Sequence, residues 1–215
     1  MAQLRAYWMA LCDAPGLPPL RSRIDPRGIA EVLEQTFLIE RVAPGVARFR
    51  LAGMRLGDLM GMDARGMVLS TLFDPASRPD LATTLDAVFT APATAELALE
   101  AERGLGRPAL EGRMLLLPLR GDDGRTTMAL GCLATDGSVG RAPRRFATAR
   151  RTVTPMTAAP KAGAATAGAA TAGAATAGEP KRAAAAEHGF AEAPRLFAAP
   201  PRPAPGRPHL RLVKS

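Results

Sequence analysis

Residues 46–73 read VARFRLAGMRLGDLMGMDARGMVLSTLF, and a change of periodicity within them decides the fold. Apolar and charged side chains alternate over residues 47–51, which predicts a half-buried strand. After Gly53 the apolar residues between positions 56 and 60 recur at spacings of three and four, which predicts a short helix with one apolar face. Further glycines keep the helical pieces short and the turns tight.

The remaining segments predict an α+β protein. Apolar spacing predicts helices near residues 4–11 and 81–89, and Asp25-Pro26 marks a third helix start. Ala43-Pro44-Gly45 predicts a hairpin turn. Strands are expected at residues 37–42, 47–51, 94–101, 110–119 and 126–135. Two strands before the central helices and three after them predict a five-stranded antiparallel sheet with short helices on one face.

Six segments resemble PAS domains, and in particular the single-domain PAS proteins of alphaproteobacteria. They read FLIERV from residue 37, ARFRLAG from residue 47, LMGMDARGM from residue 59, MLLLPL from residue 114, GCLATDG from residue 131 and RAPRRF from residue 141. The resemblance covers residues 4–146 and implies a PAS-like fold with a sensory or protein-interaction role. Because one fold serves many functions, the role is an expectation about class only.

Composition divides the chain into two parts. Residues 1–146 carry a net charge of +1 and form the expected PAS-like domain, with a helical cap at 1–35 and a core at 36–136. Residues 147–215 carry +7 and include three copies of Ala-Ala-Thr-Ala-Gly at 164–178. Recurrent glycine and the lack of an apolar face predict a disordered basic tail. This tail is either an unconstrained extension or a carrier of a short docking motif.

Histidine is absent from the expected domain, because His188 and His209 both lie in the tail. Catalytic triads and the commonest metal ligand are therefore missing from it. Cys12 and Cys132 are too few for a zinc or iron–sulfur site. We expect no catalytic residue, no metal and no cofactor, and a protein that is not an enzyme.

A methionine-rich crevice between the sheet and the short helices is the candidate ligand pocket. Methionine adapts to irregular cavities, so a small apolar ligand is one interpretation and ordinary core filling is the other. The candidate lining residues are Phe49, Leu51, Met54, Met60, Met62, Met67, Leu69 and Phe89.

The strand at 110–119 is apolar on both faces, so its outer face needs a cover. The N-terminal helix provides this cover within the chain, or a second subunit does; a homodimer is one expected assembly. The candidate interface residues are Leu4, Tyr7, Trp8, Leu11, Leu115 and Leu117.

Arg141, Arg144 and Arg145 form a basic cluster after the last predicted strand. The cluster either meets an acidic partner or ends the domain in solvent. Our leading interpretation is a module that binds a protein partner. The alternative is a DNA- or anion-associated regulator that uses this cluster and the tail, with weak binding by charge alone.

No apolar run reaches membrane-spanning length, and the first residues lack the pattern of a signal peptide. The sequence therefore predicts a cytoplasmic protein without a membrane partner.

Overall fold

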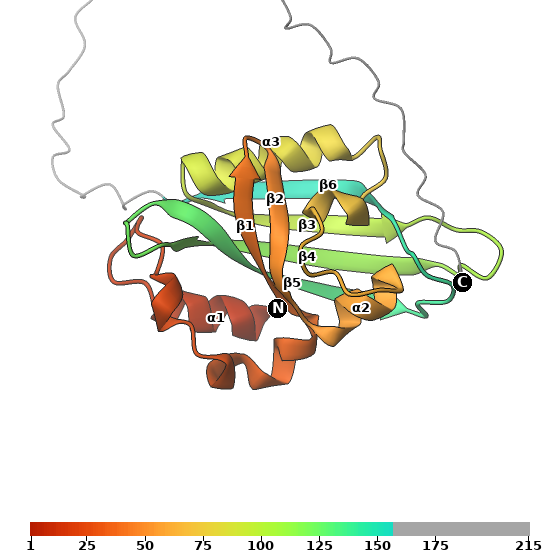
Figure 1. Ribbon diagram of the computed structural model, residues 1–215, viewed down its shortest axis with the longest axis horizontal. Helices are drawn as coiled ribbons and strands as arrows, with labels where there is room; N and C mark the ends of the chain where they lie inside the picture. The colour runs from red at the N-terminus through yellow and green to blue at the C-terminus, as the bar shows by residue number, and fades with distance from the viewer. Residues whose placement is uncertain (157–215) are drawn as a thin grey trace, which may run out of the picture. The chain divides into compact units, whose positions relative to one another are not determined.

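The computed structural model describes residues 1–156, which form an α+β fold around one antiparallel sheet (Figure 1). The sheet has six strands, where the sequence predicted five. Its strands are β1 (Thr36–Ala43), β2 (Val46–Ala52), β3 (Ala93–Ala101), β4 (Leu110–Arg120), β5 (Thr126–Gly137) and β6 (Phe146–Pro155). The helices are α1 (Ala2–Ala10), η1 (Arg21–Arg23), η2 (Pro26–Gln35), α2 (Met54–Met60), η3 (Leu69–Leu72) and α3 (Arg78–Thr90).

The strand order is β2-β1-β5-β4-β3-β6. The predicted hairpin of β1 and β2 is confirmed, and β1 also pairs with β5, so that Thr36 lies opposite Cys132. Two neighbouring pairs, β1 with β5 and β3 with β6, therefore join strands that are distant in the sequence. The expected helix after Asp25 forms as the 3-10 helix η2, and the Asp25 carboxylate accepts a hydrogen bond from the Arg27 N–H.

A β-bulge in β2 changes the direction of Leu51. Ile39 pairs with Phe49 while Leu38 pairs with Leu51, so Arg50 is the extra residue. Because a bulge shifts the alternation by one residue, Leu51 does not share the buried face of Ala47 and Phe49. Leu51 is 55% exposed.

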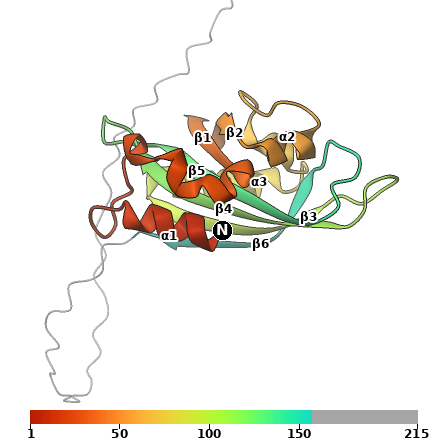
Figure 2. The ribbon, with the colours of Figure 1, turned by 90° about the horizontal axis from the view of Figure 1, so that it is seen from below.

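Two apolar clusters lie on opposite faces of the sheet. On the inner face, α2, η3 and α3 pack over Phe37, Phe49, Phe73 and Phe146. On the outer face, α1 and η2 pack over the second cluster. Figure 2 shows α1 on one side of the sheet and α2 on the other.

Strand β4 supplies both clusters. Met114 and Leu116 belong to the inner cluster, and Leu115, Leu117 and Leu119 belong to the outer one. Helix α1 covers these outer side chains within the chain. The Trp8 Nε1–H donates to the Pro118 carbonyl at 2.9 Å, so this cover also has a directional contact.

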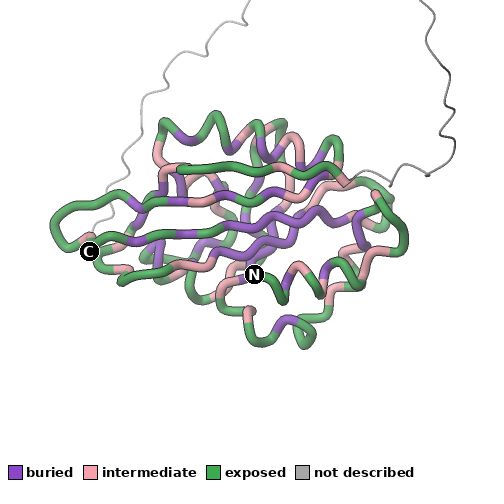
Figure 3. The backbone as a smooth tube through the Cα atoms, turned by 180° about the vertical axis from the view of Figure 1, so that it is seen from behind, coloured by how far each residue is buried: buried purple, intermediate pink, exposed green. Residues whose placement is uncertain are grey.

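Strand β6 corrects the expected start of the tail. Residues 147–155 were expected to be disordered, but they pair with β3 along its whole length. The strand lies at the edge and is largely exposed (Figure 3). The apolar alternation that signals a strand is therefore weak in it, and backbone hydrogen bonds, which any non-proline residue makes, hold it in place.

The rest of the predicted tail, residues 157–215, lies outside the described residues. None of the helices within residues 1–156 has the length and hydropathy that crossing a bilayer requires.

We expect a chain of residues 1–146 to be less stable than a chain of residues 1–156. The shorter chain keeps the buried Phe146 but loses the pairing of β6 with β3. Net backbone hydrogen bonds of about 0.5–1.5 kcal/mol each predict a loss of roughly 2–4 kcal/mol in the free energy of unfolding. Urea denaturation followed by circular dichroism measures it. Equal midpoints for the two chains would contradict a structural role for β6.

Candidate functional site

The predicted ligand crevice is filled by its own side chains. Phe49, Met60, Leu69 and Phe89 are all buried in the inner cluster, and Met67 packs against that cluster. Phe49 meets Phe37 edge to face, with 5.4 Å between ring centroids. These five side chains are therefore part of the inner core or pack against it.

The other predicted lining residues face solvent. Leu51, Met54 and Met62 are 55%, 70% and 58% exposed. The bulge turns Leu51 outward, and Met54 and Met62 flank α2 on its solvent side. The prediction of one eight-residue pocket is therefore wrong for these three. Nearby, Arg65 forms the ion pair with Asp63 that a surface position favours, at 2.6 Å. The Arg65 hydrogen bond lowers the pKa of Asp63.

The predicted interface residues meet one another within one chain. Leu4, Trp8, Leu115 and Leu117 are all at most 4% exposed in the outer cluster. The Tyr7 hydroxyl donates to the Asp25 carbonyl at 3.1 Å and accepts from the Asp25 N–H at 2.8 Å. Tyr7 thereby joins α1 to the start of η2, while Leu11 is half-buried. These residues stabilise the fold and are not a free surface.

The basic cluster divides into one buried and two exposed arginines. Arg144 is fully buried, and its guanidinium donates to the carbonyls of Val139, Glu102 and Pro108. Arg141 and Arg145 are exposed. The prediction that the cluster meets a partner or solvent therefore does not hold for Arg144.

Burial lowers the pKa of the Arg144 guanidinium, and the nearby Arg107 lowers it further. Its Nε is buried without a partner among the described residues. A charged group in this position is tolerated because three carbonyl oxygens surround it, which is the compensation that buried charge requires. Arg144 ties the β3–β4 loop to the segment before β6.

The structure shows one surface that the sequence reasoning missed. Helix α1 covers only part of the outer face and leaves an open hollow of about 770 Å³ over β5, β4, β3 and β6. Met1 and Arg5 form its rim on the α1 side, and Arg5 makes an ion pair with Glu96. The small side chains of Ala98 and Ala134 lie in its floor. We call this surface the open face.

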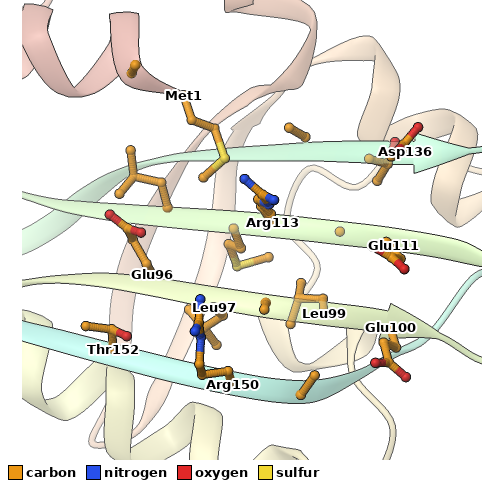
Figure 4. A pocket seen from close by; sticks show the side chains of 18 of the residues that line it. Met1, Glu96, Leu97, Leu99, Glu100, Glu111, Arg113, Asp136, Arg150 and Thr152 are labelled. Atoms are coloured by element: carbon orange, nitrogen blue, oxygen red, sulfur yellow. The ribbon is translucent and has the colours of Figure 1, made fainter.

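Charges on the open face form two rows across the strands (Figure 4). Glu111 lies opposite Glu100 on one side and opposite Asp136 on the other, which makes an acidic row. A basic row lies two positions along the strands from the acidic row. It consists of Arg113 on β4 and Arg150 on β6, each of which lies opposite Ala98 on β3. None of these five residues forms an ion pair with another described residue.

The acidic row is unfavourable for the isolated domain. Like charges directly opposite one another in a sheet repel, and no cation of residues 1–156 lies within ion-pair distance of these three. Alternation along β3 and β4 marks their charged side chains as outward, but only the pairing register brings them together. The acidic row is therefore a candidate contact surface, and it can be recognised only once the pairing of the strands is known.

A smaller hollow of about 350 Å³ lies at the end of α1, beside Trp8, Met9, Cys12 and Met156. Burial raises the pKa of both Cys12 and Cys132, so each thiol is less ionised than a free cysteine. No group of three or more His, Cys, Asp or Glu side chains within residues 1–156 is arranged to hold a metal ion. The open face is thus the larger of the two described hollows and the more strongly charged.

Comparison with protein families identifies the family of the chain. A model of the family PAS_5, described as a PAS domain, matches residues 1–134. No curated protein matches the chain. Among solved structures, an RNA-binding light-oxygen-voltage receptor is similar, with a TM-score of 0.38 and 20% identity over 55% of this chain. The match covers 36% of that receptor, so this chain spans about a third of its length.

Replacing Arg144 by Met is expected to lower the free energy of unfolding by about 3–5 kcal/mol. Hydrogen bonds to three carbonyl groups in part-buried surroundings are lost, and each contributes roughly 1–1.5 kcal/mol. Arg141→Met and Arg145→Met are matched controls on exposed positions and should stay within about 0.5 kcal/mol of the unsubstituted protein. Urea denaturation of the three variants tests this. An Arg144 variant as stable as its controls would contradict the assigned role.

Proposed function

The chain belongs to the PAS_5 family of PAS domains, and we propose that it is a sensory and protein-interaction module in bacterial signalling that binds a partner without catalysing a reaction. The observation that supports this proposal is the open face, with its two rows of opposite charge. A filled inner core favours a protein partner over a small apolar ligand. The cytoplasmic location expected from the sequence is part of the proposal.

The partner that we propose is a second copy of the chain. A two-fold axis running across the strands, midway between the rows, brings the acidic row of each copy opposite the basic row of the other. Glu111 and Arg113 lie on the same strand and are separated by one residue, so each pairs with the other residue of the second copy. Such a self-complementary patch is what an isologous contact requires. It also relieves the repulsion within the acidic row.

Helix α1 is placed to respond to this contact. Met1 and Arg5 form the rim of the open face, while Leu4 and Trp8 hold the same helix on the outer cluster. A partner that competes for Glu96 would weaken the Arg5 ion pair and shift the packing of α1. Cys132 lies fully buried in the cluster that α1 covers, so its thiol reports on that shift.

Exchanging the charges of Glu111 and Arg113 tests whether the partner is a second copy of the chain. We expect Glu111→Arg and Arg113→Glu each to weaken self-association at least about tenfold, because like charges then face each other across the axis. The double variant E111R/R113E should recover association, because both partners change sign together. Sedimentation velocity over a range of protein concentrations measures the dimer fraction. Higher salt should weaken the dimer, because exposed charges are screened.

Arg125→Glu changes an exposed charge in the β4–β5 turn and serves as the control, with association expected to be unchanged. Single variants that associate like the unsubstituted chain would refute the pairing of rows. Failure of the double variant to recover would refute the two-fold arrangement.

Self-association is also expected to change the labelling rate of Cys132 by a thiol reagent. The rate should differ between dilute and concentrated protein if α1 shifts, and hydrogen exchange of the α1 amides should change with it. Cys12→Ser removes the other thiol, so the signal comes from Cys132 alone. If the α1 amides are equally protected from hydrogen exchange in dilute and in concentrated protein, the helix does not respond to self-association.

A further inference from the structure

Two loops gather arginines at the end of the sheet away from α1. Residues 102–109 connect β3 to β4, and residues 139–145 precede β6. The first loop extends beyond the sheet in both Figures 1 and 2. We call the two loops together the arginine tip; its arginines are Arg103, Arg107, Arg141, Arg144 and Arg145.

The arginine tip is held together by its own hydrogen bonds. The Arg141 N–H donates to the Gly106 carbonyl at 2.7 Å, and the Glu102 N–H donates to the Arg145 carbonyl at 2.9 Å. The buried Arg144 guanidinium donates to carbonyls of both loops. The tip therefore presents its side chains from a fixed backbone and loses little conformational entropy when it binds.

Leu105 is the apex of this structure. It is 96% exposed, the highest value among the large apolar side chains of the described residues. Gly106 beside it has a φ of +71°, and a Cβ there would lie 3.5 Å from the Cβ of Arg141. The residue that follows Leu105 is thus next to an arginine from the other loop.

Three arginines of the tip have no counter-charge. Arg103, Arg141 and Arg145 form no ion pair with any other described residue, and Glu102, the acid within the two loops, is paired with Arg107 at 2.7 Å. An apolar apex with free guanidinium groups beside it matches the interface of an anionic bilayer. There the leucine enters the acyl boundary and the arginines meet phosphate groups.

We propose that the arginine tip docks end-on against an anionic phospholipid surface, with Leu105 inserted. End-on docking keeps the acidic row, which lies on the open face behind the tip, away from the lipid charge. A nucleic acid is the weaker match, because neither loop contains an aromatic residue for stacking and a phosphate backbone gains nothing from Leu105. The proposal departs from the sequence prediction of no membrane partner, and it stands apart from self-association.

Sedimentation of the full chain with vesicles tests the proposal. We expect binding to phosphatidylcholine vesicles that contain about 30% phosphatidylglycerol and none to phosphatidylcholine alone, since each basic residue near an anionic surface adds to the attraction. Leu105→Ser should weaken binding about tenfold, because the lost burial of a leucine corresponds to at least that factor. Arg103→Glu and Arg141→Glu should each weaken it by a similar or larger factor.

Matched controls separate the tip from general surface effects. Leu51→Ser removes another exposed leucine and Arg125→Glu another exposed arginine, and both should bind like the unsubstituted chain. Leu105→Trp should show a blue-shifted emission with the anionic vesicles, whereas Leu51→Trp should not. These substitutions lie on exposed positions, and circular dichroism confirms the fold of each variant.

Two outcomes would overturn the proposal. If Leu105→Ser binds the anionic vesicles like the unsubstituted chain, the contact is by charge alone and the leucine is not inserted. If the arginine variants instead lose binding to a labelled DNA duplex while vesicles remain unbound by every form, the tip is a nucleic-acid surface. Neither outcome depends on whether the chain pairs through the open face.

Discussion

The burial of β4 on both faces is the constraint on which the rest of the domain depends. Its alternate side chains supply two separate clusters, so each face of the sheet needs its own cover. Helices α2 and α3 cover one face, and α1 must cover the other. A helix of nine residues is too short to cover a sheet of six strands, and the uncovered remainder is the open face.

Local periodicity was enough to predict the class of fold, because the five apolar strands and the main helices bury apolar side chains at regular spacings in the sequence. It failed where structure does not depend on apolar side chains. Strand β6 is held by its backbone and exposes most of its residues, so no pattern marked it. The bulge at Arg50 depends on pairing between strands, and it moved Leu51 off the predicted face. Both features are tertiary in origin.

The candidate site was harder to predict, because the type of a residue does not determine whether its side chain is buried or which other side chains lie beside it. Arg144 belongs to a basic cluster in the sequence, yet its side chain is buried. Its hydrogen bonds join the β3–β4 loop to the segment before β6. The acidic row joins residues from three strands that only the register brings side by side. Conversely, five of the eight candidate residues of the methionine-rich crevice belong to or pack against the inner cluster. Residue chemistry alone therefore did not locate the charged surface that the fold assembles.

The strand order has a consequence for how the chain folds. The β1–β2 hairpin forms from neighbouring residues, but its place in the sheet is beside β5, and Thr36 cannot meet Cys132 until most of the domain has been synthesised. Contacts of such high sequence separation slow folding. During synthesis the apolar residues of the first half stay without their partners, and exposed apolar surface with unpaired strand edges makes such an intermediate prone to aggregation.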